Sequence, residues 1–347
     1  MVALSALPRA TPRPLLPSLS LALLLLCACG GTEAPSALYE AGAAGRGDSP
    51  GGGASGGEWQ VPPAEPGLAD VAAAQPEPQQ GTCRAIDFLF VVDNSFSMER
   101  EQSILARSFP GFMSVIADQL NALDYHVMVV DTDAMTPGEV VEAERQAPDT
   151  YDEICDITLG AGRRANRRTG SCQVSPDGRF IDAEQPDLAG AFDCIGRVGT
   201  AGSSYEQPIG ALLDATSREL TAPNACNRNF LRRDAVLVVT FMTDEDDEVT
   251  AGEPPGWRQA LLELKGGDES ALVLLGLVSD RNRSQPLPGG PCVDGADTGA
   301  PRLQSFIESF RFGSLGAVCA SDYAPFFERA VSVIGDACRE FVPPEIR

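Results

Sequence analysis

Apolar residues within residues 83–341 follow two alternating patterns. Continuous runs of branched and aromatic residues predict strands that are buried on both faces of a parallel sheet, and these runs occupy residues 86–92, 125–134, 235–248 and 270–280. Elsewhere apolar residues recur at helical spacing, which predicts helices at residues 97–123, 203–220, 256–266, 301–312 and 324–341. Strands that alternate with helices predict an α/β fold, with an open, mostly parallel sheet and helices on both of its faces.

Two of the helices and one long segment carry further signals. Pro110 lies inside the 97–123 helix and predicts a kink or a division there. Ser203 followed by Glu206 matches a capping box, which predicts that a helix begins at Ser203. Residues 134–200 have little periodicity and contain three cysteines. We expect this segment to be an insertion, stapled by disulfides and carrying short elements of its own.

Residues 1–28 have the features of a signal peptide. Arg9 and Arg13 precede an apolar run that is about as long as a signal-peptide core and shorter than a membrane span. The run ends in "LCACG", residues 26–30, which resembles the lipobox of bacterial lipoproteins. The resemblance implies that Cys29 is lipidated and that acyl chains form the membrane anchor. An ordinary secretory signal is the alternative.

The residue after Cys29 bears on the location of the protein in the cell envelope. In some bacteria an Asp at this position marks retention in the inner membrane, and Gly30 stands here instead. We therefore expect an anchor in the outer membrane, on its periplasmic or its surface face, rather than in the inner membrane.

The remainder of the chain divides into a tether and a domain. Residues 29–80 are rich in Gly, Pro, Ala and acids and nearly free of branched apolar side chains, so they cannot bury enough surface to fold. We expect a disordered tether there. Residues 81–345 are sufficient for one large domain, with the cysteine-containing insertion at about 134–200 within it.

The charge of the chain limits its partners. The formal net charge is −23 at pH 7, and such acidity repels nucleic-acid phosphates and anionic membrane surfaces. We expect no nucleic-acid binding, and membrane contact only through the lipid anchor.

Eight cysteines remain beyond the lipidated position, and an even number in an exported chain predicts disulfides: Cys83, Cys155, Cys172, Cys194, Cys226, Cys292, Cys319 and Cys338. A zinc site is disfavoured because the chain has one histidine and no CxxC pair. Chain ends often lie close together in compact domains, which predicts a bridge between Cys83 and Cys338. Short separations in the sequence favour two further bridges, Cys155 with Cys172 and Cys292 with Cys319.

Three predicted strands end in an aspartate: Asp93, Asp244 and Asp280. The carboxyl ends of parallel strands form the edge at which open α/β sheets bind ligands. Asp93 is followed at alternate positions by Ser95 and Ser97, which brings three oxygens into a small space. Hard oxygen ligands suit Mg²⁺ first, with Mn²⁺ or Ca²⁺ as alternatives.

The stretch "FVVDNSFSM", residues 90–98, resembles the DxSxS motif that opens von Willebrand factor type A (VWA) domains. The resemblance implies a Rossmann-like sheet and a metal-ion-dependent adhesion site, with one divalent cation held by the DxSxS residues, a threonine on a second loop and an aspartate on a third. The third-loop aspartate corresponds to Asp244. The chain departs from the family at the second loop, where Ser203 occupies the expected position and Thr200 and Ser204 are the alternatives.

The same resemblance implies a binding protein and not an enzyme. Ser95, Ser97 and the second-loop hydroxyl would contact the ion directly, while Asp93 and Asp244 would act mainly through waters. Neutral direct ligands leave the ion electrophilic, so that it accepts an acidic residue of a protein or surface polymer.

Two other functions stay open from the sequence. One is a VWA-fold structural or envelope-assembly module without a working metal. The other is a metal-dependent hydrolase that uses Asp93, Asp244 and Asp246, although no histidine or cysteine base pairs with a nucleophile in the sequence. A second cation at Asp246 or Asp247 is a further alternative to a solvated acidic run.

Overall fold

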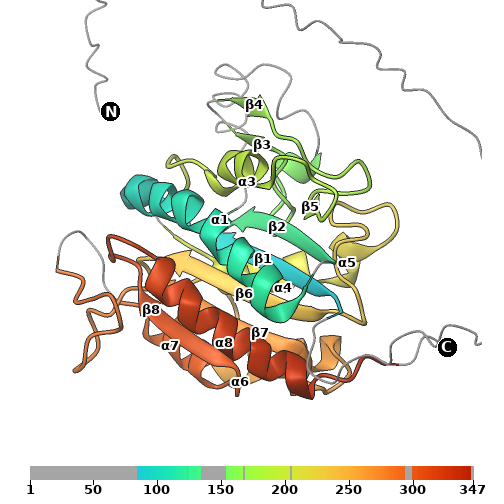
Figure 1. Ribbon diagram of the computed structural model, residues 1–347. Helices are drawn as coiled ribbons and strands as arrows, with labels where there is room; N and C mark the ends of the chain where they lie inside the picture. The colour runs from blue at the N-terminus through green and yellow to red at the C-terminus, as the bar shows by residue number, and fades with distance from the viewer. Residues whose placement is uncertain are drawn as a thin grey trace, which may run out of the picture. The chain divides into compact units, whose positions relative to one another are not determined.

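The central sheet has six strands in the order β5-β2-β1-β6-β7-β8 (Figure 1). The computed structural model describes residues 84–122, 124–133, 154–166, 169–203, 205–293 and 299–344. The strands of the sheet are β1 Ile86–Val92, β2 Tyr125–Asp131, β5 Ile181–Asp182, β6 Val236–Thr243, β7 Leu272–Val278 and β8 Gly313–Ala317. Neighbouring strands are parallel, except that β5 pairs antiparallel with β2. The predicted α/β fold with a mostly parallel sheet is confirmed.

Helices cover the sheet in two groups: α1 Glu99–Leu120, α3 Leu188–Gly196, α4 Pro208–Ala215, α5 Arg218–Thr221, α6 Pro254–Leu264, α7 Pro301–Glu308 and α8 Ala324–Glu340. In one group α1 packs against α3 and α8, and in the other α6 packs against α4 and α7. The connection through α1 leads from β1 to β2, towards one edge of the sheet. The connections through α4, α6 and α7 lead to β6, β7 and β8 in turn, towards the other edge. Right-handed crossovers therefore place the two groups on opposite faces.

Burial on both faces explains why the central strands are continuously apolar. Every residue of β1, β6 and β7 is buried. Aromatic side chains join the helices of one face to one another, and Phe109 of α1 stacks on Phe192 of α3. Phe112 of α1 likewise stacks on Phe327 of α8.

Three features differ from the sequence prediction. Pro110 does not divide α1, which continues through it as one helix of 22 residues, so of the two predicted outcomes the division was wrong. The helix expected from Ser203 begins at Pro208 instead, and Gln207 is its N-cap. The capping-box prediction was therefore wrong, because the described residues just before Pro208, which are Ser203 and Tyr205 to Gln207, are not helical. The strand β8 was missed, since its sequence "GSLGA" has a single large apolar residue.

The insertion is built from short elements. The described ones are the two-stranded pair β3 Ala165–Asn166 and β4 Gly170–Ser171, the edge strand β5, the helix α3 and a short 3₁₀-helix at Ile154–Asp156. Two further 3₁₀-helices lie outside the insertion, at Phe96–Met98 and Glu269–Ala271.

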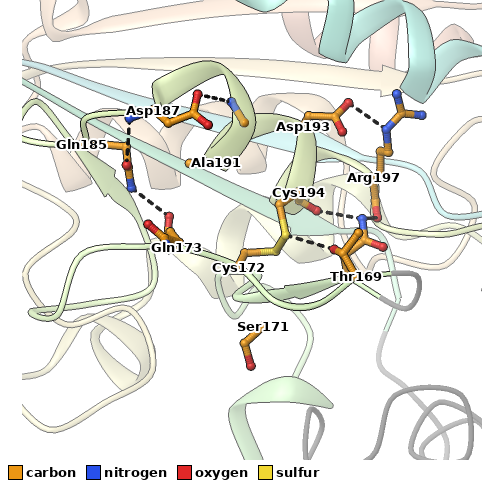
Figure 2. A pocket seen from close by; sticks show the side chains of 12 residues that line it. Thr169, Ser171, Cys172, Gln173, Gln185, Asp187, Ala191, Asp193, Cys194 and Arg197 are labelled. Atoms are coloured by element: carbon orange, nitrogen blue, oxygen red, sulfur yellow. Dashed lines mark hydrogen bonds and ion pairs between the residues drawn. A yellow bond between two sulfur atoms is a disulfide. The ribbon is translucent and has the colours of Figure 1, made fainter. Parts of the chain in front are cut away.

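Three disulfides join described cysteines: Cys155–Cys226, Cys172–Cys194 (Figure 2) and Cys292–Cys319. The Cys292–Cys319 prediction is confirmed, whereas the Cys155–Cys172 prediction was wrong. The side chain of Asn227 donates hydrogen bonds to Gly160 O at 2.8 Å and to Ala215 O at 3.0 Å. These bonds hold the start of the insertion against the end of α4, which brings Cys155 to Cys226.

Several predictions concern residues outside the described ranges. They are the signal segment, the tether, lipidation at Cys29 and the second-loop alternative Ser204. Cys338 is disulfide-bonded, but its predicted partner, Cys83, also lies outside the described residues. Within the described part of the chain, no helix combines the length and the apolarity that crossing a membrane requires.

Candidate functional site

The first loop of the site follows β1 at the carboxyl edge of the sheet. Val92 pairs with Met242 of β6, so the residues that follow them, Asp93 and Thr243, come side by side. Asp93 is buried, and its Oδ1 accepts a hydrogen bond from Ser95 N at 2.7 Å. Its Oδ2 accepts one from Thr243 Oγ1, also at 2.7 Å. Asp93 therefore joins the ends of β1 and β6.

The two serines of the motif lie above this buried carboxylate. Ser95 Oγ and Ser97 Oγ are 3.0 Å apart. Ser97 Oγ donates to Asp244 Oδ1 at 3.1 Å. The structure thus brings together Asp93, Ser95, Ser97 and Asp244, four of the residues predicted to form the metal site.

The second loop is attached to the first through Asp133, at the end of β2. One carboxylate oxygen of Asp133 accepts from Asn94 Nδ2 at 2.6 Å, and the other accepts from Ser203 N at 2.5 Å. The predicted ligand Ser203 is therefore close to the first loop. Its own hydroxyl accepts a hydrogen bond from Tyr205 N at 2.9 Å, which forms a local turn.

Gln102 of α1 adds a second connection between the loops. Its buried amide nitrogen donates to Asp93 O at 2.9 Å and to Gly199 O at 2.7 Å. The alternative ligand Thr200 follows Gly199 directly. The start of the second loop is therefore held at the base of the DxSxS loop.

Glu206 is a site residue that sequence reasoning missed. It was assigned to a capping box, but its side chain is 1% exposed and lies in the loop before α4. Thr132 Oγ1 donates to its Oε2, while its Oε1 is buried without a hydrogen-bond partner. A useful signal was present: Glu206 is an acid on the loop that the VWA resemblance identifies as the source of a ligand.

Burial makes Asp93 and Glu206 harder to ionise than exposed carboxylic acids. Burial raises the pKa of Asp93 to about 6, although hydrogen bonds from Thr243 and Ser95 oppose this rise. Burial, followed by the negative charge of Asp93, raises the pKa of Glu206 to about 9. The negative charge of Asp93 thus opposes the ionisation of Glu206.

Three other acids at this edge support the backbone. Asp246 accepts hydrogen bonds from Arg302 N and Leu303 N, both at 2.9 Å, at the start of α7. Asp247 accepts one from Ile209 N at 2.8 Å, at the start of α4. The carboxylate of Asp280 accepts from Leu287 N and Cys292 N, at 2.9 and 2.8 Å, and thereby holds the following loop. Asp280 is thus not among the residues gathered around Asp93, and Asp246 and Asp247 serve helix starts.

The donor set decides how a cation could be held. Among the described residues, no three His, Cys, Asp or Glu side chains form a group that could hold a metal ion by themselves. A cation here would therefore need the hydroxyls of Ser95 and Ser97. The unpaired Oε1 of Glu206 supplies a further oxygen, so the residues present fit a hard divalent ion.

Exposed apolar side chains lie on the same loops. Phe96, between the two motif serines, is 89% exposed, and Tyr205, next to Glu206, is 71% exposed. Val249, on the loop after β6, is 46% exposed. Large exposed apolar side chains are thus present on the first and second loops and on the loop after β6.

A hollow of about 700 Å³ lies in the insertion beside the Cys172–Cys194 bridge (Figure 2). The acids at its edge are engaged locally: Asp187 accepts from Gly190 N at 2.9 Å, and Asp193 pairs with Arg197 at 2.8 Å. Asp187 and Asp193 therefore stabilise the two ends of α3. The carboxyl edge of the sheet, where several polar side chains meet, is the stronger candidate for a binding site.

Comparison with known proteins finds matches to this chain among solved structures. No protein-family model and no curated protein matches it. Two solved structures of proximal thread matrix protein 1 from the mussel byssus are similar to it, with 12% and 16% identity and TM-scores of 0.36 and 0.37. The similarity covers 73% and 74% of this chain, but 49% and 47% of those chains. The chain thus spans about half the length of the structures it matches, and the VWA resemblance stays a prediction.

Proposed function

We propose that this chain is a lipid-anchored, exported protein with a VWA-type domain that binds a protein or a surface polymer through a divalent cation. Mg²⁺ is the first expectation, and Mn²⁺ and Ca²⁺ are the alternatives. The observation that carries the proposal is the continuous contact from Ser95 through Ser97 to Asp244, above the buried Asp93. The required oxygens come from loops far apart in the sequence and meet at the edge where α/β sheets bind ligands.

The arrangement favours binding over chemistry on a substrate. A bound cation would supply a Lewis-acidic position that accepts an oxygen from the partner, for which an acidic side chain is the expected donor. Ser95 and Ser97 would contact the ion, and Asp93 and Asp244 would orient waters around it. The exposed ring of Phe96 stands between the two serines and would pack against the partner.

Calorimetric titration of Mg²⁺, Mn²⁺ and Ca²⁺ into the full chain tests the site. We expect saturable one-site binding that is lost in Asp93→Ala and strongly weakened in Ser95→Ala. Asp118→Ala and Ser114→Ala are the matched controls, because both residues are exposed on α1, and they should bind like the parent. Absence of binding by a folded parent would reject the proposal and favour a structural module without metal.

The anchor has a separate test. Cys29→Ala should move the protein from the detergent phase to the aqueous phase in a partitioning experiment, because the acyl chains provide the membrane affinity. A variant that stays in the detergent phase would reject lipidation at Cys29.

A further inference from the structure

Glu206 combines features that are expected of a cation ligand. Its side chain is almost completely buried, and its Oε2 accepts a hydrogen bond from Thr132. Its Oε1 is also buried but has no hydrogen-bond partner. Burial of an oxygen without a partner costs free energy, and a cation would remove that cost.

The position of Glu206 is fixed from both sides. On one side, Gln207 N donates to Thr132 O at 2.9 Å, which pins the backbone after Glu206 to the end of β2. On the other side, Ser203 N is bound to Asp133. Glu206 therefore projects from a loop held at the carboxyl edge of the sheet, and the negative charge of Asp93 raises its pKa.

Ser203, the ligand expected from the sequence, is less suited to this role. Its hydroxyl already accepts the hydrogen bond of Tyr205 N and stabilises a local turn. Its side chain is only partly buried, so water can satisfy the remaining capacity of its hydroxyl. Glu206 Oε1 has no such access to water.

We propose that Glu206, and not a hydroxyl, is the second-loop ligand of the cation, an inference that rests on the proposed function. Ser95 and Ser97 complete the set of direct ligands. Glu206 supplies a negative charge in direct contact with the ion, which a threonine or serine does not. The protein then compensates more of the ion's charge itself, so the cation stays bound in the absence of the partner.

Binding of Mn²⁺ to the full chain, followed by the loss of the electron paramagnetic resonance signal of the free ion, tests this assignment. Glu206→Gln keeps the shape of the side chain and removes its charge, and it should weaken Mn²⁺ binding by about tenfold or more. Ser203→Ala should stay within about twofold of the parent, since its hydroxyl serves the turn. Asp93→Ala should lose the site.

Thermal unfolding in EDTA separates a lost ligand from a damaged fold. Glu206→Gln should unfold at or above the temperature of the parent there, because an amide is cheaper to bury than a carboxylate. Parent-like Mn²⁺ binding by Glu206→Gln, together with loss of binding in Asp93→Ala, would overturn the role of Glu206 and leave the proposed function intact. Absence of Mn²⁺ binding by the parent would overturn both.

Discussion

At the scale of single residues, Asp93 and Glu206 couple the stability of the metal-free chain to pH. Burial raises the pKa of Asp93 from 3.8 to about 6 and that of Glu206 from 4.5 to about 9. Between the two values for Glu206, the folded chain holds a proton that the unfolded chain has released. The stability that depends on this proton is fully present below 4.5, the pKa of Glu206 in the unfolded chain. It is lost as the pH rises towards about 9, the pKa of Glu206 in the folded chain.

The metal-free full chain should accordingly unfold at a lower temperature at pH 8.5 than at pH 5. We expect a fall in the midpoint of about 5 °C or more in EDTA, measured by scanning calorimetry. Glu206→Gln should remove most of this fall, because the amide does not titrate. Equal pH dependence in the parent and in Glu206→Gln would show that other groups control it.

The grouping of the first-loop and third-loop residues could be predicted, whereas the sequence pattern assigned Glu206 to a capping box. Asp93, Ser95 and Ser97 lie in one short motif directly after an apolar strand, and Asp244 directly follows another. Glu206 lies three positions after Ser203, a spacing that also predicts a capping box. Only the observed start of α4 at Pro208 shows that this spacing belongs to a loop.

At the scale of elements, the loop after β6 organises helices that are distant in the sequence. Asp247 is fully buried, and one of its carboxylate oxygens accepts from Ile209 N at 2.8 Å and from Thr250 Oγ1 at 2.7 Å. Ile209 lies in the first turn of α4, three positions after Glu206. The acid after the third strand thereby helps to position the second loop of the site.

Asp247→Ala should destabilise the chain by about 2–3 kcal/mol, because it leaves buried donors without an acceptor. Chemical denaturation followed by circular dichroism measures this loss. The neighbouring exposed residue provides a matched control, and Glu248→Ala should change stability by less than about 0.5 kcal/mol. Similar losses in the two variants would contradict the role given to Asp247.

The elements with the strongest patterns were the predictable ones. β1 occupies the predicted residues 86–92 because both of its faces are covered, and its sequence is apolar throughout. In β8, two glycines replace large side chains, and Gly316 has the ring of Phe326 so close that a Cβ atom would clash with it. The ring of Phe326, from α8, therefore packs directly on the backbone of β8, and the strand lacks the run of large apolar residues that would have predicted it.

At the scale of the whole molecule, the Cys155–Cys226 disulfide connects the insertion to the sheet domain. Cys155–Cys226 spans 71 residues, whereas Cys172–Cys194 spans 22 and stays within the insertion. Local separation was a poor guide to these pairs, because Asn227 brings the start of the insertion to the end of α4. Folding, and not distance along the chain, determines the partner of Cys155.

The two bridges should contribute unequally to stability, because they close loops of different lengths. A longer closed loop restricts the unfolded chain more, so Cys155→Ser with Cys226→Ser should cost about 1 kcal/mol more than Cys172→Ser with Cys194→Ser. Guanidinium denaturation of the two double variants, each beside the parent, measures the difference. A larger loss from the shorter bridge would mean that native contacts, and not chain entropy, dominate.

The direction of β1 has a consequence for how the proposed site meets its partner. The described chain enters the sheet at Ile86, and the site follows Val92, roughly 23 Å away at the rise of a strand. The helix α8 contacts Glu269–Ala271, just before the start of β7, at the same edge as Ile86 (Figure 1). Phe96 and the motif serines therefore lie at the end of the sheet remote from the point where the described chain enters it, and a partner of the proposed site would approach the domain from that end.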